Sequence, residues 1–348
     1  MRYAPRLVLV LAPLAAALGH AGEPFTIGFG SCLRQEDPQP VWEGVRASAP
    51  DVFVMGGDNV YTDMGLYRLR REPARIGSAY RRLAEEPGFA ALQAQTPLYA
   101  TWDDHDYGAN DAGAEYPYKV ESKRYFVDFF RIPADSPMRR REGVHDAHWP
   151  GGRERGIQLV LLDTRSFRSL QIAEPTDEAC PHRRWGRNED PAATVLGKAQ
   201  WAWLAARLAE TARLHVVVSS IQAIPEEHCF EKWANFPRER ERLLELLAAA
   251  SAPVLLLSGD RHLAEISRLQ RPGWRYPLLE LTSSGMNSAR REGDPESNRH
   301  RALPGPIRED NFATVSVGGQ PGELQLSLAV RGTDGRVLQS LEAAYPAR

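Results

Sequence analysis

The chain has 348 residues, enough for one large α/β domain or two average domains. Hydrophobic residues make up 43% and charged residues 25%, a balance that is typical of a globular protein and argues against disorder. Lys and Arg number 43 against 45 Asp and Glu, so the net charge of -2 gives no electrostatic reason to expect a nucleic-acid partner.

The N-terminus has the layout of a secretory signal peptide. Arg2 and Arg6 precede an apolar run over residues 7–18, and small residues follow it. The run is shorter than the roughly 20 residues that a membrane span needs, and no later segment comes close. We therefore predict a signal peptide over residues 1–21, no membrane span, and a periplasmic or secreted protein. A buried N-terminal helix is the alternative, although Glu23-Pro24 ends the pattern where cleavage would fall.

Three cysteines in an exported chain predict one disulfide and one free thiol. Cys180 and Cys229 lie in polar, loop-like stretches, whereas Cys32 ends an apolar strand. We expect Cys180 and Cys229 to pair and Cys32 to stay free.

Short apolar runs alternate with helical patterns along most of the chain. Several runs are almost continuously apolar, as expected for strands buried on both faces. The predicted strands are 25–29, 52–55, 97–101, 157–162, 215–219, 253–257 and 277–281. The spacing of Trp201, Leu204 and Leu208 predicts a helix over 198–211, and Pro237 stands at the start of another over 238–250.

The C-terminal segment changes character. Leu324, Leu326, Leu328 and Val330 alternate with polar neighbours, which is typical of an antiparallel strand with one buried face, and residues 312–317 are similar. A stretch rich in Pro, Gly and charge predicts a long loop over 290–308. Since no repeat or linker divides the chain, we predict a single catalytic domain over 23–348 with C-terminal strands, in which two sheets pack face to face between helices.

Polar residues follow six of the predicted strands at the point where each strand ends. Open α/β sheets bind ligands beyond the carboxyl ends of their strands. A single Asp after a strand is more often a helix cap or a turn residue, but six such ends in order favour a ligand site. The segments are Gly30-Ser31-Cys32, Gly57-Asp58-Asn59-Val60-Tyr61-Thr62-Asp63, Trp102-Asp103-Asp104-His105-Asp106 with Asn110, Asp163-Thr164-Arg165, Ser219-Ser220-Ile221-Gln222 and Ser258-Gly259-Asp260-Arg261-His262.

Four of these segments resemble the sequence blocks of the alkaline phosphatase D-like (PhoD-like) phosphatases, a family of the metallophosphoesterase superfamily. Gly57-Asp58-x-x-Tyr61 is similar to a block that this family shares with purple acid phosphatases, and the segments that begin at Gly30, Trp102 and Ser258 are similar to the family's other blocks. The similarity extends from Phe25 to about Gly285. It implies an α/β fold, a four-layer α-β-β-α sandwich of two mixed sheets with flanking helices, and a metal cluster at the strand ends.

The resemblance also implies two metal sites that share Asp58 as a bridging carboxylate. Cys32, Tyr61 and His262 would complete the first site. Free Tyr ionises near pH 10 and free Cys near pH 8.5, so Fe(III) would hold both as anions better than Mg²⁺ or Ca²⁺. The second site would use oxygen donors, which favour Ca²⁺. Its predicted ligands are Asp58, Asp104, Asn110 and Asp260, with Gln222 as a further candidate.

Zn²⁺ and Mn²⁺ are the alternative metals. The wider superfamily has His at the positions of Gln222 and Asp260, and this difference argues against two transition metals here. Structural interpretations also stay open for individual ligands. Cys32 could be a small buried hydrophobe, Tyr61 a packing ring and Asn110 a turn cap. Asp63 could bind metal directly, support a ligand or cap the loop.

The catalytic candidates are a histidine and an arginine. His105, flanked by Asp104 and Asp106, matches the family's histidine, and we predict that it protonates the leaving alkoxide. Its alternative is a structural loop histidine. Arg165 is predicted to clamp phosphate oxygens, with a surface ion pair as the alternative. Trp233 either lines the mouth of the site or packs in the interior.

Together these residues predict an exported, metal-dependent hydrolase of phosphate mono- or diesters. We expect a monomer that acts on a small-molecule phosphate ester. The alternatives are a non-catalytic phosphate-binding or structural protein of the same fold, and a hydrolase of another phosphoester such as a phospholipid.

Overall fold

The computed structural model describes residues 23–64, 73–178, 180–181, 184–291, 296–320 and 322–346. The predicted signal peptide, residues 1–21, lies outside the described residues. Among the described helices, none is both long and apolar enough to cross a membrane.

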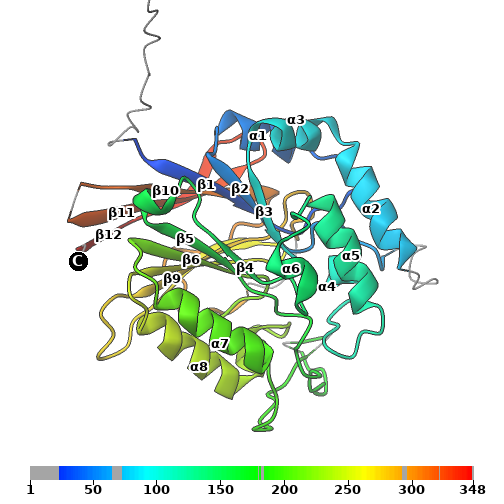
Figure 1. Cartoon of the computed structure of the whole chain (residues 1–348). Coiled ribbons are helices and arrows are strands. Elements are labelled where there is room, and N and C mark those ends of the chain that lie inside the picture. The colour runs from blue at the N-terminus through cyan, green and yellow to red at the C-terminus, as the bar shows by residue number, and fades with distance from the viewer. Residues whose placement is uncertain are drawn as a thin grey trace, which may run out of the picture.

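Two six-stranded mixed sheets pack face to face as the inner layers of the molecule (Figure 1). The first sheet has the order β12-β11-β10-β1-β2-β3. Within it β1, β2 and β3 run parallel, and β10 pairs with β1 in antiparallel register. Its strands are β1 (Phe25–Gly30), β2 (Val52–Gly56), β3 (Leu98–Thr101), β10 (Asn311–Gly318), β11 (Glu323–Gly332) and β12 (Val337–Pro346).

The second sheet has the order β4-β5-β6-β7-β9-β8. Its four central strands are parallel, and β4 and β8 are antiparallel strands at the two edges. The strands are β4 (Asp146–His148), β5 (Ile157–Leu161), β6 (Leu214–Ser219), β7 (Val254–Ser258), β8 (Ala264–Leu269) and β9 (Leu278–Ser283).

Helices cover the outer face of each sheet (Figure 1). On the first sheet, Phe53 and Met55 of β2 pack into a cluster with side chains of α1 (Val41–Ala47), α2 (Ala74–Ala84), α3 (Pro87–Gln95) and α5 (Lys119–Phe129). On the second sheet, Val217 and Leu256 pack with side chains of α7 (Gly197–Leu208) and α8 (Pro237–Ala248). The short helices α4 (Asp104–Tyr107) and α6 (Pro137–Arg140), and the 3₁₀ turns η2 (Arg153–Arg155) and η3 (Trp233–Asn235), lie between these elements.

The main hydrophobic core lies between the two sheets. Alternate side chains such as Ile27 and Phe29 of β1 meet Leu159 of β5 and Leu257 of β7. Because each central strand has this core on one face and helices on the other, its sequence is apolar almost throughout. The predicted four-layer α-β-β-α sandwich is therefore confirmed.

The two sheets are joined where their central strands end. Ser31, after β1, forms an isolated parallel bridge with Ser284, after β9. The hydroxyl of Thr101, at the end of β3, donates to the carbonyl oxygen of Leu162 after β5 at 2.6 Å. These contacts bring the polar segments that follow both sets of strands to one edge of the sandwich.

Cys180 and Cys229 form the predicted disulfide, with their Cα atoms 5.7 Å apart. Cys32 is a free, buried thiol, also as predicted.

Candidate metal centre

Four of the predicted ligands share an unusual backbone conformation. Cys32, Asp58, Asp260 and His262 have positive φ values of 60°, 51°, 68° and 55°. This left-handed region is unfavourable for residues with a Cβ atom and persists only where the surrounding structure enforces it. Four of the seven non-glycine residues with positive φ in the described part of the chain lie at these strand ends, which makes the strand ends a candidate functional site.

Glycine is needed beside these turns because the segments approach one another closely. Gly57 has φ 104°, and a Cβ atom there would lie 2.7 Å from the Cβ of Asp103. A Cβ atom on Gly259 would collide with the side chain of Ser31. Gly57 thus lets the segments after β2 and β3 of the first sheet approach each other, and Gly259 lets the segment after β7 of the second sheet approach the one after β1.

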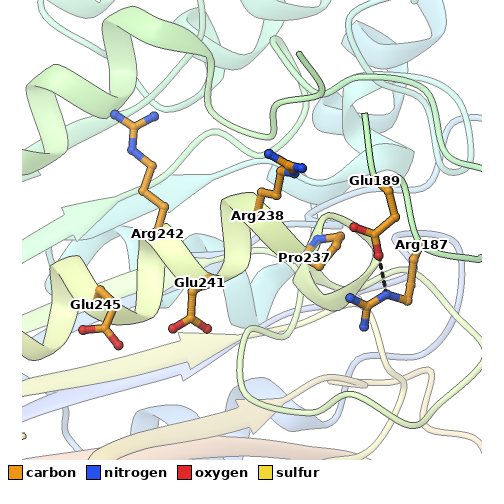
Figure 2. Close-up of a pocket in the computed structure, with 7 residues that line it drawn as sticks. All are labelled: Arg187, Glu189, Pro237, Arg238, Glu241, Arg242 and Glu245. Atoms are coloured by element: carbon orange, nitrogen blue, oxygen red, sulfur yellow. Dashed lines mark hydrogen bonds and ion pairs between the residues drawn. The ribbon is translucent and has the colours of Figure 1, made fainter. Parts of the chain in front are cut away.

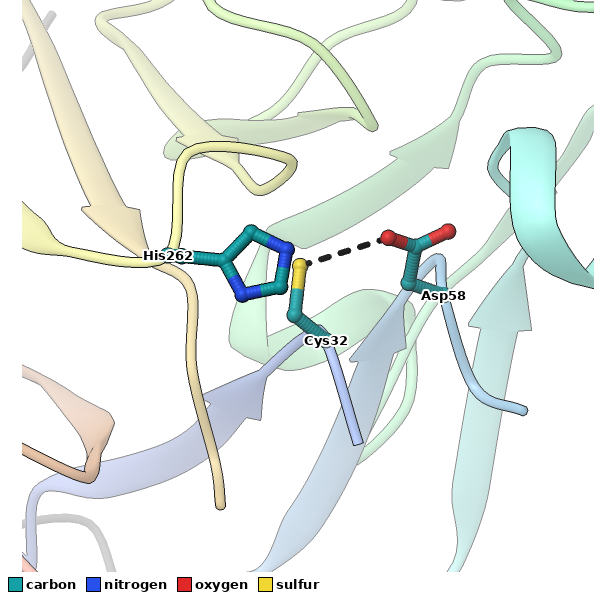
Figure 3. Close-up of side chains that lie close together, drawn as sticks. All are labelled: Cys32, Asp58 and His262. Atoms are coloured by element: carbon teal, nitrogen blue, oxygen red, sulfur yellow. Dashed lines mark hydrogen bonds between the residues drawn. The ribbon is translucent and has the colours of Figure 1, made fainter. Parts of the chain in front are cut away.

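A first group of donor atoms converges on the Asp58 carboxylate. Figure 3 shows Cys32, Asp58 and His262 pointing toward one another from three separate segments, and their donor atoms all lie within 4.8 Å of one another. The Cys32 Sγ is 3.5 Å from Asp58 Oδ2. The Tyr61 hydroxyl is 3.0 Å from the same oxygen and 3.3 Å from His262 Nε2.

The His262 ring is oriented for ligation through Nε2. Its Nδ1 lies 2.6 Å from the backbone oxygen of Ser288, which can only accept a hydrogen bond, so Nδ1 carries the proton. Nε2 then presents its lone pair to Tyr61 and Asp58. Ser284, which contacts the Cys32 thiol at 3.0 Å and accepts from the His262 amide at 2.7 Å, holds both ligands in place. Sequence reasoning missed Ser284 and Ser288, whose only signal was their position after a strand.

A second group consists of carboxylates. Asp103, Asp104 and Asp260 have oxygens within 4.8 Å of one another, and Asp104 also shares such a group with Asp58 and His105. Oxygen-rich groups of this kind suit hard cations.

Burial makes both groups costly unless a cation neutralises them. It raises the pKa of the Cys32 thiol and of the Tyr61 phenol well above their ordinary values, and the adjacent Asp58 carboxylate raises both further. Burial likewise raises the pKa of Asp58 well above its usual range and that of Asp260 to about 6. Since several buried acids that repel one another are stable as anions only beside positive charge, the donor set fits bound metal ions.

His105 occupies the first turn of α4, beside the carboxylates. Its Nδ1 is 2.5 Å from Asp63 Oδ1, and its backbone amide donates to Asp58 Oδ1 at 3.2 Å. Burial lowers the pKa of His105, but the surrounding carboxylates, Asp104 first among them, outweigh burial and raise it well above its ordinary value. The Asp63 carboxylate, which is not a member of either donor group, also raises the pKa of His105 through its contact with Nδ1. Asp63, whose role the sequence left open, also accepts from the amide of Asn110 at 2.6 Å.

Asp106 positions the segments around the site, a role that sequence reasoning missed. Its carboxylate accepts from the amides of Asp58 at 3.2 Å and Asp103 at 2.7 Å, and from the Asn59 side chain at 2.6 Å. With Asp103 it forms the capping box of α4. The spacing of these two acidic residues was the available signal, since a capping box pairs residues three apart.

Arg165 lies in a buried ion-pair network. Its Nε donates to Asp103 Oδ1 and one of its terminal nitrogens donates to Glu231 Oε2, both at 2.5 Å. Arg168 binds the other oxygen of Glu231 at 2.9 Å. Arg165 has no exposed surface. This geometry favours the alternative role, an ion pair, over the predicted phosphate clamp, although the ion pair is buried and not at the surface.

Three other candidates have distinct surroundings. Asn110 is exposed, and its side-chain amide donates to Asp111 Oδ2 at 2.5 Å. The Gln222 side-chain nitrogen donates to Glu265 and Thr282, while its oxygen is buried without a hydrogen-bond partner among the described residues. Trp233 is fully buried against Trp201, which supports its packing interpretation.

A hollow of about 520 Å³ on the surface of α8 is separate from this centre (Figure 2). Charged side chains of α8 and the Arg187–Glu189 ion pair line it, and it contains none of the predicted site residues. We assign it no role.

Comparison with known proteins identifies the family. The family model described as PhoD-like phosphatase matches residues 27–316. The chain belongs to the PhoD-like phosphatase family. This membership makes it a metal-dependent hydrolase of phosphoric esters, and the donor groups at the strand ends are its candidate metal-binding residues.

One solved structure of a PhoD protein shares the fold. The structure of PhoD superposes with a TM-score of 0.72 at 18% identity, covering 95% of this chain and 71% of that one. A 5'-nucleotidase precursor from Thermus thermophilus gives a TM-score of 0.39 at 12% identity, covering 93% of this chain and 54% of that one. A search of curated proteins found no match.

Proposed function

We propose that this PhoD-like phosphatase hydrolyses phosphate mono- or diesters outside the cytoplasm, as a monomer, at a two-metal centre bridged by Asp58. The observation that carries the proposal is the convergence of Cys32, Tyr61 and His262 on the Asp58 carboxylate. The buried donor set, which suits cations, and the His105 ring that Asp63 holds beside it support turnover over a purely structural role.

The two donor groups differ in the ions they suit. Cys32, Tyr61 and His262 supply a thiolate, a phenolate and an imidazole, which together favour Fe(III). Asp58, Asp104 and Asp260 supply carboxylate oxygens, which favour Ca²⁺. Gln222 is a further candidate ligand, because its buried side-chain oxygen has no hydrogen-bond partner among the described residues. Asn110 would have to give up its contact with Asp111 to join this site. Zn²⁺ or Mn²⁺ are the alternative occupants.

When bound, such cations neutralise phosphate oxygens, lower the pKa of a bound water and orient it for in-line attack. The chain's own residues then control the departure of the leaving group. Asp63 accepts the Nδ1 proton of His105 and stabilises the imidazolium, in which Nε2 also carries a proton. The imidazolium can pass this proton to the leaving alkoxide, with Asp63 keeping the ring in position. The Arg165 network holds the carboxylate of Asp103, a member of the second donor group, in its buried position.

Metal analysis of natively exported protein, combined with hydrolysis of a mono- and a diester of nitrophenol, tests this proposal. We expect both metals and activity in the wild type. Asp58→Asn should remove activity and both metals, because one carboxylate serves two ions. Asp128→Asn is the matched control, since Asp128 lies on the exposed side of α5 in an ion pair with Arg139. Normal metal content in Asp58→Asn contradicts the bridging role, and a metal-loaded wild type that cleaves neither ester contradicts the function.

A further inference from the structure

A group of basic side chains borders the candidate metal centre and has no part in the chemistry above. Arg261 stands between the predicted ligands Asp260 and His262, and its terminal nitrogen is 3.8 Å from Asp260 Oδ2. The backbone amide of Arg290 donates to the carbonyl oxygen of His262 at 2.9 Å, so the backbone of Arg290 also lies beside a predicted ligand. His228 and Lys232 lie close enough to Arg261 for its charge to lower the pKa of both. We call Arg261, Arg290, His228 and Lys232 the basic cluster.

An aromatic ring organises two members of the cluster. The guanidinium carbon of Arg261 lies 4.2 Å from the ring centroid of Phe230, and that of Arg290 lies 5.0 Å from it. Both distances are within the range of cation–π attraction. The disulfide at Cys229 secures the segment that carries Phe230 and its neighbours, so the cluster is held on a braced loop.

Two members of the cluster are buried without the partners that buried polar groups normally have. His228 is 5% exposed, and neither of its ring nitrogens has a hydrogen-bond partner among the described residues. Lys232 is 4% exposed, and its ammonium donates to the backbone oxygen of Phe230 at 3.0 Å rather than to a carboxylate. A buried ring without a hydrogen-bond partner costs about 1–3 kcal/mol, and a buried ammonium without a counter-charge costs more. Such groups call for an explanation in a native structure, and a bound ion that supplies the missing partner is one.

Among the described residues, the charges in this region do not balance. Burial and the nearby Arg261 lower the pKa of Lys232 to about 8, so Lys232 is still mainly cationic at neutral pH. Burial lowers the pKa of His228 well below its ordinary value, so its ring is a neutral donor and acceptor. Glu296 binds Arg261, and Asp260 is assigned to metal. Lys232 and Arg290 therefore lack a carboxylate within ion-pair distance in the described part of the chain.

We propose that the basic cluster binds a second anionic group of the substrate, a phosphate or a carboxylate carried by the leaving group of the ester. This inference rests on the proposed function, because it places the scissile phosphate at the metal centre. An anion at the cluster accepts hydrogen bonds from Lys232, His228 and Arg290 and relieves their unpaired state. The preferred substrates are then phosphate esters with an additional negative charge several bonds from the reacting phosphorus.

The test uses three substrates with the same three-carbon chain: propyl phosphate, 1,3-propanediol bisphosphate and 3-(phosphonooxy)propanoate. Phosphate release gives kcat/KM for each. We expect the wild type to prefer an anionic substrate over propyl phosphate by about tenfold or more, as one charge-assisted hydrogen bond provides. Preference for the bisphosphate alone identifies a phosphate subsite, and preference for both anionic substrates identifies a general anion subsite.

Two variants locate the effect. Lys232→Met should lower the preference ratio by about tenfold, mainly through KM. Arg290→Gln should lower it as well, and because Arg290 is exposed this change carries little risk to folding. Lys198→Met, the same chemical change on the exposed face of α7, is the matched control and should leave the ratio unaltered.

Equal kcat/KM values for the three substrates in the wild type would overturn the proposed anion subsite. The same conclusion would follow if the preference for an anionic substrate were unaltered both in Arg290→Gln and in a folded, metal-loaded Lys232→Met. If none of the three monoesters is hydrolysed and neither nitrophenyl ester is cleaved, the proposed function fails. Calorimetric binding of propyl phosphate and the bisphosphate then still decides the subsite, since tighter binding of the bisphosphate must depend on Lys232.

Discussion

His105 Nδ1 lies 2.5 Å from Asp63 Oδ1, and because a carboxylate oxygen can only accept, Nδ1 carries a proton and donates it to Asp63. The contact favours the imidazolium, in which Nε2 carries a second proton. Asp63 also accepts from the amide of Asn110. It therefore ties the segment after β2 to the loop after α4, and the His105 ring is held by two parts of the chain.

His105→Ala should lose rate mainly on esters with poor leaving groups. Proton donation to an alkoxide contributes about 10²–10⁴-fold, whereas nitrophenolate leaves without much help. Comparing kcat for an alkyl and a nitrophenyl phosphate checks this. Asp63→Asn should show the same selectivity with a smaller loss, since it misorients the ring without removing it. Equal losses on both esters would exclude His105 as the acid.

If Cys32, Tyr61 and His262 bind Fe(III), the protein should be coloured. A Tyr61 phenolate bound to Fe(III) should give a broad visible charge-transfer band, which neither Ca²⁺ nor Zn²⁺ produces. Tyr61→Phe should bleach or shift the band and keep the fold, because one hydroxyl is lost; Cys32→Ser should shift it differently. The measurement is a visible spectrum of protein exported into an oxidising, calcium-containing medium. A colourless, fully active enzyme without iron would refute the Fe(III) assignment and leave the phosphoesterase proposal standing.

Glu231→Gln should destabilise the protein strongly. The change leaves Arg165 and Arg168 buried beside a neutral side chain, and breaking a buried ion pair typically costs about 3–5 kcal/mol. Urea unfolding measures the loss. Glu189→Gln removes an exposed ion pair with Arg187 and should change stability by less than about 1 kcal/mol. Similar, small losses in both variants would argue that the buried network is not a structural support.

Loss of the Cys180–Cys229 disulfide should lower the free energy of unfolding. The bond closes a loop with a sequence separation of 49 residues, for which chain entropy predicts a contribution of about 4 kcal/mol. The double variant Cys180→Ala/Cys229→Ala, compared with wild type in urea, measures it without a reductant that would also reach Cys32. An unchanged unfolding midpoint would contradict the prediction.

His215 should make stability depend on pH. It is buried between Gln158 and Ser251, and burial lowers its pKa from 6.5 to about 4. The unfolded chain therefore binds the proton more tightly, so this contribution is fully present above pH 6.5 and is lost as pH falls toward 4. The free energy of unfolding should change by up to about 1.4 kcal/mol per pH unit in this range. Urea unfolding between pH 7 and 4.5 should show a shallower slope in His215→Asn; equal slopes would exclude His215 as the source.

The sequence by itself determined the layered core and the identity of the strand ends. Continuous apolar runs such as β2 and β7 could be recognised because burial on both faces leaves a local pattern. The strand β12 was missed since its side chains are mostly half-exposed or exposed, and β4 was missed because it is only three residues long. The cysteine pairing was also predictable, as only one thiol ended an apolar strand.

Only the tertiary structure decided which polar side chains lie close together and which are bound in buried ion pairs. Arg165 and Asp58 both follow a strand, yet Arg165 is enclosed by two carboxylates while Asp58 faces Cys32 and Tyr61. The basic cluster joins His228 and Lys232 to Arg290, which is far from them in sequence. Ion pairs form over a few ångströms between residues of any sequence separation, so the local sequence pattern does not predict them.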